Sequence, residues 1–261
     1  MSSSTDGIRP TSFDADAAVI DGKPAPSARV PLSRDRIIGA AITFVDEQGL
    51  RDLTMRRLGA TLGVEAMSLY RYVPGREELL DGVVETIIGE MYDDKDVLTE
   101  PRDGWQDFLQ RLAHGVRRVA LAHPQAFPLV ASRPTEAPWI RPPLRNLRWV
   151  ELFLDGLIDE GFSQEAAVVA YRGFTSFLLG HLLLEVSSLG ADVGPLDVID
   201  PSTGDPDLVE YPTVRRLSGA LSENHAATEF EEALESLLER LQLMLTQVVT
   251  PAPADRDPRR D

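Results

Sequence analysis

Apolar side chains recur every three or four residues through most of the chain between residues 33 and 248. This spacing puts them on one face of an α-helix, and glycines and prolines divide the pattern into segments of ordinary helix length. No stretch alternates apolar and polar residues for long enough to form a β-sheet. The sequence therefore predicts an all-α fold.

The first third of the chain contains two short helical segments with a tight connection between them. The expected helices are a first between Ser33 and Gly49, a second between Thr54 and Gly63, a third at about Ala66–Tyr72 and a fourth from Arg76 to about Tyr92. Gly59 would let the second and third helices cross closely, and Gly63 would permit the turn between them. Such a helix-turn-helix also occurs in proteins that do not bind DNA.

The remainder of the chain is predicted to form longer helices. They are expected at about residues 105–119, 126–132, 144–157, from 163 to beyond 184, at 214–221 and at 230–248. The acidic segment 190–212, rich in Pro and Gly, is expected to be a long loop. We predict a DNA-binding head at 31–92, a larger domain at 93–250, and disordered tails at 1–30 and 251–261.

The protein is acidic, with 42 Asp and Glu residues against 26 Lys and Arg residues and a formal net charge of -16. Indiscriminate binding to nucleic acids is not expected, because attraction to phosphates is the sequence-independent part of DNA affinity. The segment from Arg51 to Arg76 is an exception, because its five arginines and two acidic residues give a net charge of +3. This local positive charge coincides with the helix-turn-helix.

Several functional classes are disfavoured by what the sequence lacks. It has no cysteine, which excludes disulfides, thiolate metal sites and cysteine nucleophiles. The first ten residues lack the features of a secretory signal, and no apolar run approaches the roughly 18 to 20 residues of a membrane span, so we expect a cytoplasmic protein. The four histidines are scattered, and no motif of a hydrolase or nucleotide-binding loop is present, so we expect neither an enzyme nor a cofactor.

Two segments resemble a known family of regulators. The run LTMRRLGATLGVEAMSLYRYVPGREELLDGVVETI, residues 53–87, resembles the DNA-binding head of the tetracycline-repressor (TetR) family. The run SRPTE and the later DEGFSQEAAVVAYRGFTSFLLG resemble the regulatory domain of the branch nearest the tetracycline repressors. The resemblance covers roughly residues 31–190 and implies a repressor that a small molecule releases from a palindromic operator.

The resemblance assigns DNA-contacting roles to residues of the head. The implied contacts are Arg56, Ala66, Met67, Ser68, Tyr70, Arg71, Tyr72 and Arg76. Arg56 would contact a base, plausibly guanine, and Ala66 and Met67 offer only methyl contacts where the tetracycline repressors have glutamine, so the operator should differ. The two tyrosines, Arg71 and Arg76 would contact phosphates. A solvated side chain for either Arg56 or Arg71, and a packing role for Tyr72, remain alternatives.

The regulatory domain is expected to form a homodimer and to bind an organic effector. The resemblance implies that the apolar helix after Ser163 and the last helix form a four-helix bundle with a second subunit, although both stripes are also compatible with core packing in one chain. The ligand cavity is expected among the fifth to eighth helices, and each candidate also fits an ordinary place in the core. The candidates are Trp105, Phe108, Leu112, Phe127, Trp149, Phe153, Tyr171, Phe174, Phe177 and His181.

A metal-dependent effector is not expected. Tetracycline repressors hold a magnesium chelate through a histidine four residues before the arginine of the SRPTE-like motif. In this chain that arginine is Arg133, and Leu129 occupies the earlier position, so the ligand for magnesium is absent. The main alternative function is a helical small-molecule sensor that does not bind DNA specifically.

Overall fold

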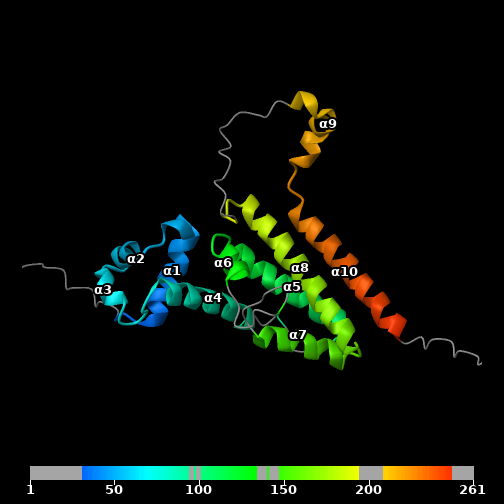
Figure 1. Ribbon diagram of the computed structural model, residues 1–261, viewed down its shortest axis with the longest axis horizontal. Helices are drawn as coiled ribbons and strands as arrows, with labels where there is room; N and C mark the ends of the chain where they lie inside the picture. The colour runs from blue at the N-terminus through cyan, green and yellow to red at the C-terminus, as the bar shows by residue number, and fades with distance from the viewer. Residues whose placement is uncertain are drawn as a thin grey trace, which may run out of the picture. The chain divides into compact units, whose positions relative to one another are not determined.

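The computed structural model describes residues 31–93, 97, 101–133, 140, 147–193 and 208–248. Every regular element in these residues is helical, which confirms the all-α prediction (Figure 1). In chain order the elements are α1 (Arg34–Gln48), η1 (Leu50–Asp52), α2 (Met55–Leu62), α3 (Ala66–Leu69), α4 (Arg76–Asp93), α5 (Trp105–Ala122), α6 (Phe127–Ser132), α7 (Leu147–Asp159), α8 (Gln164–Ser188), η2 (Leu208–Glu210), α9 (Pro212–Leu221) and α10 (Ala226–Val248). The predicted tails and most of the predicted loop at 190–212 lie outside the described residues.

Side chains at helix starts account for several of the boundaries that the sequence predicts. The hydroxyl of Ser33 accepts a hydrogen bond from the Arg36 backbone N–H at 3.2 Å, and Thr54 caps α2 in the same way through Arg57. Ser163 caps α8. Each cap satisfies a backbone donor that lacks a partner within its helix. Because these residues favour extended backbone and supply the acceptor, the chain enters each helix there.

The turn between α2 and α3 depends on two glycines, as the sequence predicts. Gly63 has a left-handed backbone with φ of 70°, a conformation that most other residues adopt only at a cost. At Gly59 a Cβ atom would lie 2.9 Å from the backbone oxygen of Val64, so the close approach of α2 to α3 requires a residue without a side chain. Helix α3 ends at Leu69, three residues earlier than predicted, and the chain continues through turns toward Val73.

Helix α8 lies at the centre of the larger part of the fold. It contacts α5, α6, α7 and α10, and Figure 1 shows it beside α10. Its length of 25 residues and a mean hydropathy of 1.4 over an 18-residue window would suffice for a membrane span. The expectation that no segment approaches such a span is therefore too strong. Contacts with these four helices account for part of its apolar composition, because residues such as Ala170, Phe174 and Leu182 are buried between helices, while 39% of the window is buried in all.

The apolar stripe of the last helix is largely used inside the chain. Phe230, Leu234, Leu238 and Leu241 are between 0% and 6% exposed and belong to the core formed with α5 and α8. This corrects the expectation that the stripe faces a second subunit, because a side chain already covered by α8 has no surface left to share. Leu243, at 61%, is the large apolar residue of α10 that is exposed among those whose side chains the structure describes.

Candidate DNA-binding surface and ligand cavity

The residues assigned to DNA contact lie together at the helix-turn-helix and are accessible. Arg56 is exposed on α2, and Met67, at 73% exposed, projects from α3 while Ala66 and Ser68 are half-buried beside it. Of the aromatic pair, Tyr70 is 42% exposed and Tyr72 is 40% exposed. Arg71 and Arg76 are also exposed. Leu58, Leu69 and Val73 are at most 1% exposed and hold the two short helices together.

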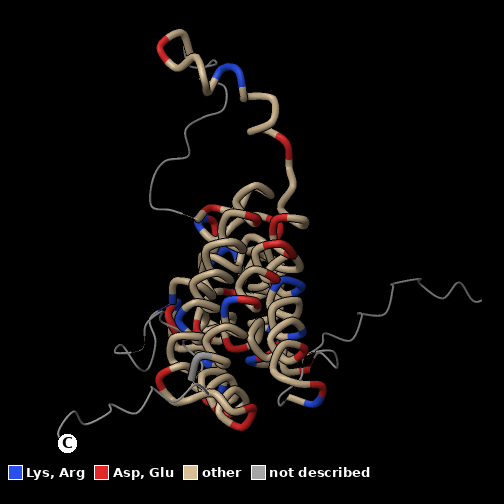
Figure 2. The backbone as a smooth tube through the Cα atoms, turned by 90° about the vertical axis from the view of Figure 1, so that its right-hand side faces the viewer, with Lys and Arg blue, Asp and Glu red and all other residues tan. Residues whose placement is uncertain are grey.

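The arginines of this segment divide into two groups. Arg57 pairs with Asp52 at 2.8 Å, donates to Gln48 at 2.7 Å and stacks over the ring of Phe44. Arg51 pairs with Asp192. By contrast, Arg56, Arg71 and Arg76 form no ion pair with another described residue. Basic positions are scattered among acidic ones over the helices (Figure 2), and within the head these three arginines leave positive charge available to an outside partner.

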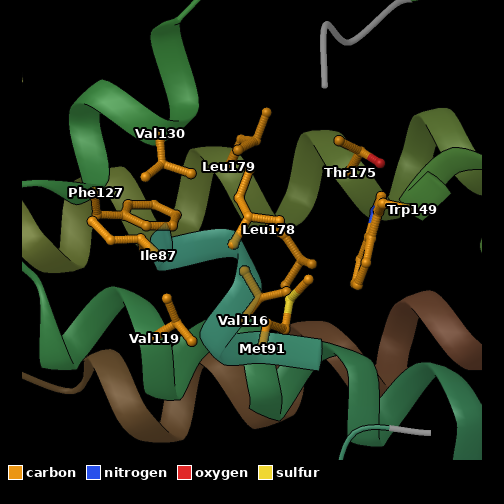
Figure 3. A pocket seen from close by; sticks show the side chains of 11 residues that line it. Ile87, Met91, Val116, Val119, Phe127, Val130, Trp149, Thr175, Leu178 and Leu179 are labelled. Carbon is orange, nitrogen blue, oxygen red and sulfur yellow. The ribbon is translucent and has the colours of Figure 1, made fainter. Parts of the chain in front are cut away.

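An apolar cavity of about 80 Å³ lies between α4, α5, α6, α7 and α8 and is partly open to solvent. Figure 3 shows its walls, with Phe127 and Val130 at one end and Trp149 and Thr175 at the other. The lining residues are Ile87, Ile88, Met91, Val116, Val119, Phe127, Val130, Trp149, Thr175, Leu178 and Leu179. None of these side chains is titratable, so the cavity suits an uncharged and largely apolar molecule.

Only Phe127 and Trp149 of the predicted ligand residues line this cavity. Phe108, Leu112 and Phe153 line a smaller space of about 10 Å³ together with Trp149 and Tyr92. The other predicted side chains pack in aromatic contacts: Trp105 on Phe162, Tyr171 and Phe174 on Phe153, and Phe177 and His181 on Phe230. His181 also lies within hydrogen-bonding distance of the Ala226 carbonyl oxygen, at 3.1 Å, as expected of a satisfied core histidine.

Helix α4 contributes a wall of the cavity that the sequence analysis does not anticipate. Ile87, Ile88 and Met91 line it, and the same helix begins at Arg76 directly after the helix-turn-helix. In the sequence these residues look like ordinary apolar positions of an amphipathic helix, so composition gives no signal that they border a cavity. Their position means that a bound molecule would touch the element that carries the DNA-binding head.

The hydroxyl of Thr175 is the other feature that sequence reasoning misses. Thr175 is 3% exposed, and its Oγ1 atom has no hydrogen-bond partner among the described residues. Burial raises the pKa of Tyr171, one turn earlier on α8, and the nearby Thr175 hydroxyl offsets part of that rise without meeting hydrogen-bond geometry. A buried hydroxyl without a partner costs stability. The one signal in the sequence is a polar residue inside the apolar run of α8.

Three polar links join the larger part of the fold to α4 and to the head. Arg133, at the end of α6, pairs with Glu77 and Asp81 of α4, each at 2.8 Å, and its side chain is 12% exposed. His123, after α5, contacts Asp46 of α1 at 2.7 Å and Glu90 of α4 at 2.9 Å. Although burial opposes the charged imidazolium, the two carboxylates together raise the pKa of His123 above its ordinary value. The third link is Arg51 with Asp192.

The potential metal ligands of the described residues do not gather around the cavity. Within the described residues no group of three or more His, Cys, Asp or Glu side chains is placed to hold a metal ion. Leu129 itself is 7% exposed and belongs to α6. The residues present at the cavity therefore do not fit a magnesium chelate.

Comparisons with known proteins agree with this architecture. The family model of tetR-family bacterial regulatory proteins matches residues 37–83, and that of the tetracyclin repressor-like C-terminal domain matches residues 99–245. The chain is 33% identical to tetracycline repressor protein class E of Escherichia coli over 155 residues, which are 59% of this chain and 69% of that protein.

Two solved structures from Streptomyces coelicolor extend the likeness over most of the chain. A possible TetR family transcriptional regulator is 27% identical, with a TM-score of 0.62, 81% of this chain covered and 99% of that chain. ActR in complex with (S)-DNPA is 25% identical, with a TM-score of 0.58 and coverage of 82% and 98%. Because the C-terminal model alone matches more than half of its length, the chain belongs to the TetR family of ligand-responsive, DNA-binding transcriptional regulators.

Proposed function

We propose that the protein is a dimeric cytoplasmic repressor without enzymatic activity, released from a palindromic operator when an uncharged organic effector enters the cavity beside α4. The single observation that carries this proposal is the shared helix: α4 follows the helix-turn-helix directly and also lines the cavity. TetR-family regulators are generally transcription factors without enzymatic activity. The relatives support the rest, since one is named a tetracycline repressor and another is a complex with a small molecule.

In this proposal the DNA contacts come from one exposed face of the head. Arg56 reads a base pair through its guanidinium, and Ala66 and Met67 contact thymine methyl groups. Tyr70, Arg71, Tyr72, Ser68 and Arg76 complete the contacts to bases and phosphates. Support comes from the exposure of these side chains, except the half-buried Ala66 and Ser68, and from the absence of ion pairs at the three arginines among the described residues. Arg57 is assigned to the structure of the head, because Asp52 and Phe44 already hold it.

The second subunit is assigned to the outer faces of α8 and α10. Leu184 is 74% exposed, Val169 is 49% exposed and Leu243 is 61% exposed, although the inner faces of both helices are buried in the same chain. Apolar residues this exposed on two adjacent helices are typical of a surface that another subunit covers. A two-fold dimer places two recognition helices about one DNA turn apart, roughly 34 to 36 Å, as a palindrome requires.

Communication between the cavity and the DNA is assigned to α4 and to its link with α6. A molecule between Phe127 and Val130 of α6 and Ile87 of α4 would change how these helices pack. Arg133 then carries a displacement of α6 to the first half of α4 through its bonds to Glu77 and Asp81. A small tilt of α4 changes the separation of the two recognition helices in the dimer. An effector that binds the tilted state more tightly than the DNA-binding state lowers operator affinity. The ratio of its affinities for these two states sets the largest possible effect.

Selection of bound sequences from a random DNA library tests the proposal with the full chain. The expected product is a palindrome with half-sites about one helical turn apart, bound specifically in gel-shift assays and in the presence of excess EDTA. Arg56→Ala should relax selection at one base pair in each half-site, and Arg57→Ala should not. Recovery of random sequence alone would contradict the proposal and favour a sensor that does not read DNA.

A further inference from the structure

We propose that Thr175 is the specificity-determining group of the cavity, selecting an uncharged ring compound that carries one hydrogen-bonding oxygen at the end near Trp149. This inference rests on the proposed function, because it concerns the effector of the same cavity. Thr175 is the lining residue on α8 whose side-chain oxygen is buried without a partner among the described residues. All the other lining side chains except the Trp149 indole present only carbon or sulfur atoms.

The unpaired hydroxyl is informative because it is costly. Replacing a buried unpaired hydroxyl by a methyl group of the same shape is often neutral or stabilising. A valine at this position would fit the apolar run of α8, so the benefit of threonine to the empty protein is limited to the contact by which its hydroxyl lowers the pKa of Tyr171. A ligand oxygen placed against Oγ1 would satisfy the hydroxyl and regain that cost, since a hydroxyl can donate as well as accept.

The rest of the lining restricts the ligand further. Burying a charged group without a partner is far more costly than burying a neutral one, and the described lining offers no side chain of opposite charge. Ring compounds are favoured because Phe127 and Trp149 stand at opposite ends of the space, as Figure 3 shows. The preferred ligand therefore has a flat apolar body, no charge and one oxygen at the end where Thr175 lies.

Three probes with one carbon skeleton test this inference: tetralin, its ketone α-tetralone and a tetralin carboxylate. Binding to the full-length protein is measured by calorimetric titration in the absence of DNA. The ketone is expected to bind about three- to tenfold more tightly than the hydrocarbon, the range set by one net hydrogen bond. The carboxylate is expected to bind most weakly. Failure of all three probes to bind, or tightest binding of the carboxylate, would overturn the inference.

Variants at position 175 test whether the Thr175 hydroxyl causes the preference for the ketone over the hydrocarbon. Thr175→Val should bring the ratio of the ketone and hydrocarbon affinities close to one, whereas Thr175→Ser should retain the preference. Ser176→Ala removes an exposed hydroxyl from the next residue of the same helix and should leave the ratio unchanged. The thermal midpoint of the ligand-free Thr175→Val protein should equal or exceed that of the parent, which shows that the variant folds.

An unchanged affinity ratio in folded Thr175→Val would overturn the role of Thr175. That result would leave operator release untouched, because the probes are compared without DNA. Conversely, intact discrimination between the probes in a protein that does not bind DNA would contradict the proposed function and not this inference.

Discussion

The helix-turn-helix and the cavity both hold polar groups that have no partner among the described residues, but the cost of this differs between them. On the head, Arg56, Arg71 and Arg76 are exposed, so water solvates their charges until DNA replaces it. In the cavity, the Thr175 hydroxyl is buried among apolar side chains, so its lack of a partner costs stability until a ligand arrives. The difference implies that the head binds through charge and the cavity through burial, and these two forces respond differently to solution conditions.

The largest expected effect is that of salt concentration, which should weaken operator binding much more than ligand binding in the cavity. If the dimer contacts about six to eight phosphates, operator affinity should fall about a thousandfold or more between about 50 mM and 200 mM salt. Binding of α-tetralone to the cavity should change little over the same range, because neither the ligand nor the described lining is charged. Anisotropy titrations measure the affinity for operator DNA, and calorimetry measures the affinity for the ketone. An operator complex that is insensitive to salt would contradict the electrostatic account of the head.

Substitutions on α10 should distinguish residues buried in the core of one chain from residues at the proposed interface between two subunits. Leu241 is 2% exposed. Leu241→Glu would bury a carboxylate without a partner and should therefore destabilise the fold by about 3 to 5 kcal/mol. Leu243→Glu, two residues later, should leave the helical content unchanged, shift the particle mass in light scattering toward a monomer and abolish operator binding. The control is Ile158→Glu on α7, exposed at 39% and outside the proposed interface. A Leu243→Glu protein that remains a dimer would place the interface elsewhere.

Neighbouring arginines of α2 should separate DNA reading from support of the head. Arg56→Ala is expected to lower the affinity for the preferred base pair by about 1 to 3 kcal/mol and to leave α-tetralone binding unchanged. Arg57→Ala removes bonds to Asp52 and Gln48 and should lower thermal stability while sequence preference is retained. Gel shifts with single-base operator variants provide the measurement. Equal loss of preference in both variants would contradict the division of the arginines into two groups.

A break in the link between α6 and α4 should uncouple the two sites. Arg133→Gln removes the ion pairs to Glu77 and Asp81. Both sites should still bind, but an effector that weakens operator binding tenfold in the parent should have little effect in the variant, a loss of about 1.4 kcal/mol of coupling. Arg111→Gln, which breaks an ion pair within α5, is the matched control. Undiminished coupling in Arg133→Gln would exclude this link as the route.

The smallest expected effect is the pH dependence of the stability that His123 contributes. The folded-state pKa of His123 is raised, so the stability gained from the charged imidazolium is fully present below its unfolded pKa near 6.5 and lost as pH rises through the folded value. The thermal midpoint of the parent should therefore fall relative to His123→Gln as pH increases above about 6.5. His225→Gln, an exposed residue paired with nearby Glu223, serves as control. Parallel pH profiles for parent and His123→Gln would contradict this assignment.

Local signals made the head easier to predict than the cavity. Capping by Ser33 and Thr54 and the turn at Gly63 act within a few residues, so the sequence displays them directly. The cavity depends instead on packing between helices that are far apart in the sequence and leave a space between their side chains. Its aliphatic lining on α4 looks the same in the sequence as core residues elsewhere, and the pairing of Arg133 with Asp81 joins residues 52 positions apart.

The aromatic residues illustrate the same limit. Large apolar side chains were expected at the ligand site, but Tyr171, Phe174, Phe177 and His181 pack against Phe153 or Phe230 and do not line the cavity beside α4. The burial of the α10 stripe within one chain was equally invisible, because a helix that packs on its own chain and one that packs on a partner show the same apolar spacing.

The central claim, that an uncharged molecule beside α4 releases DNA without a metal, is tested most directly by reciprocal binding. The tightest-binding member of a panel of neutral aromatic ketones is titrated into the free protein and into its operator complex, both in excess EDTA. The account predicts binding in EDTA and an affinity for the operator complex lower by the same factor as the ketone lowers operator affinity, because linkage is reciprocal. Loss of binding on chelation, or equal affinity for the free and DNA-bound protein, would contradict the account.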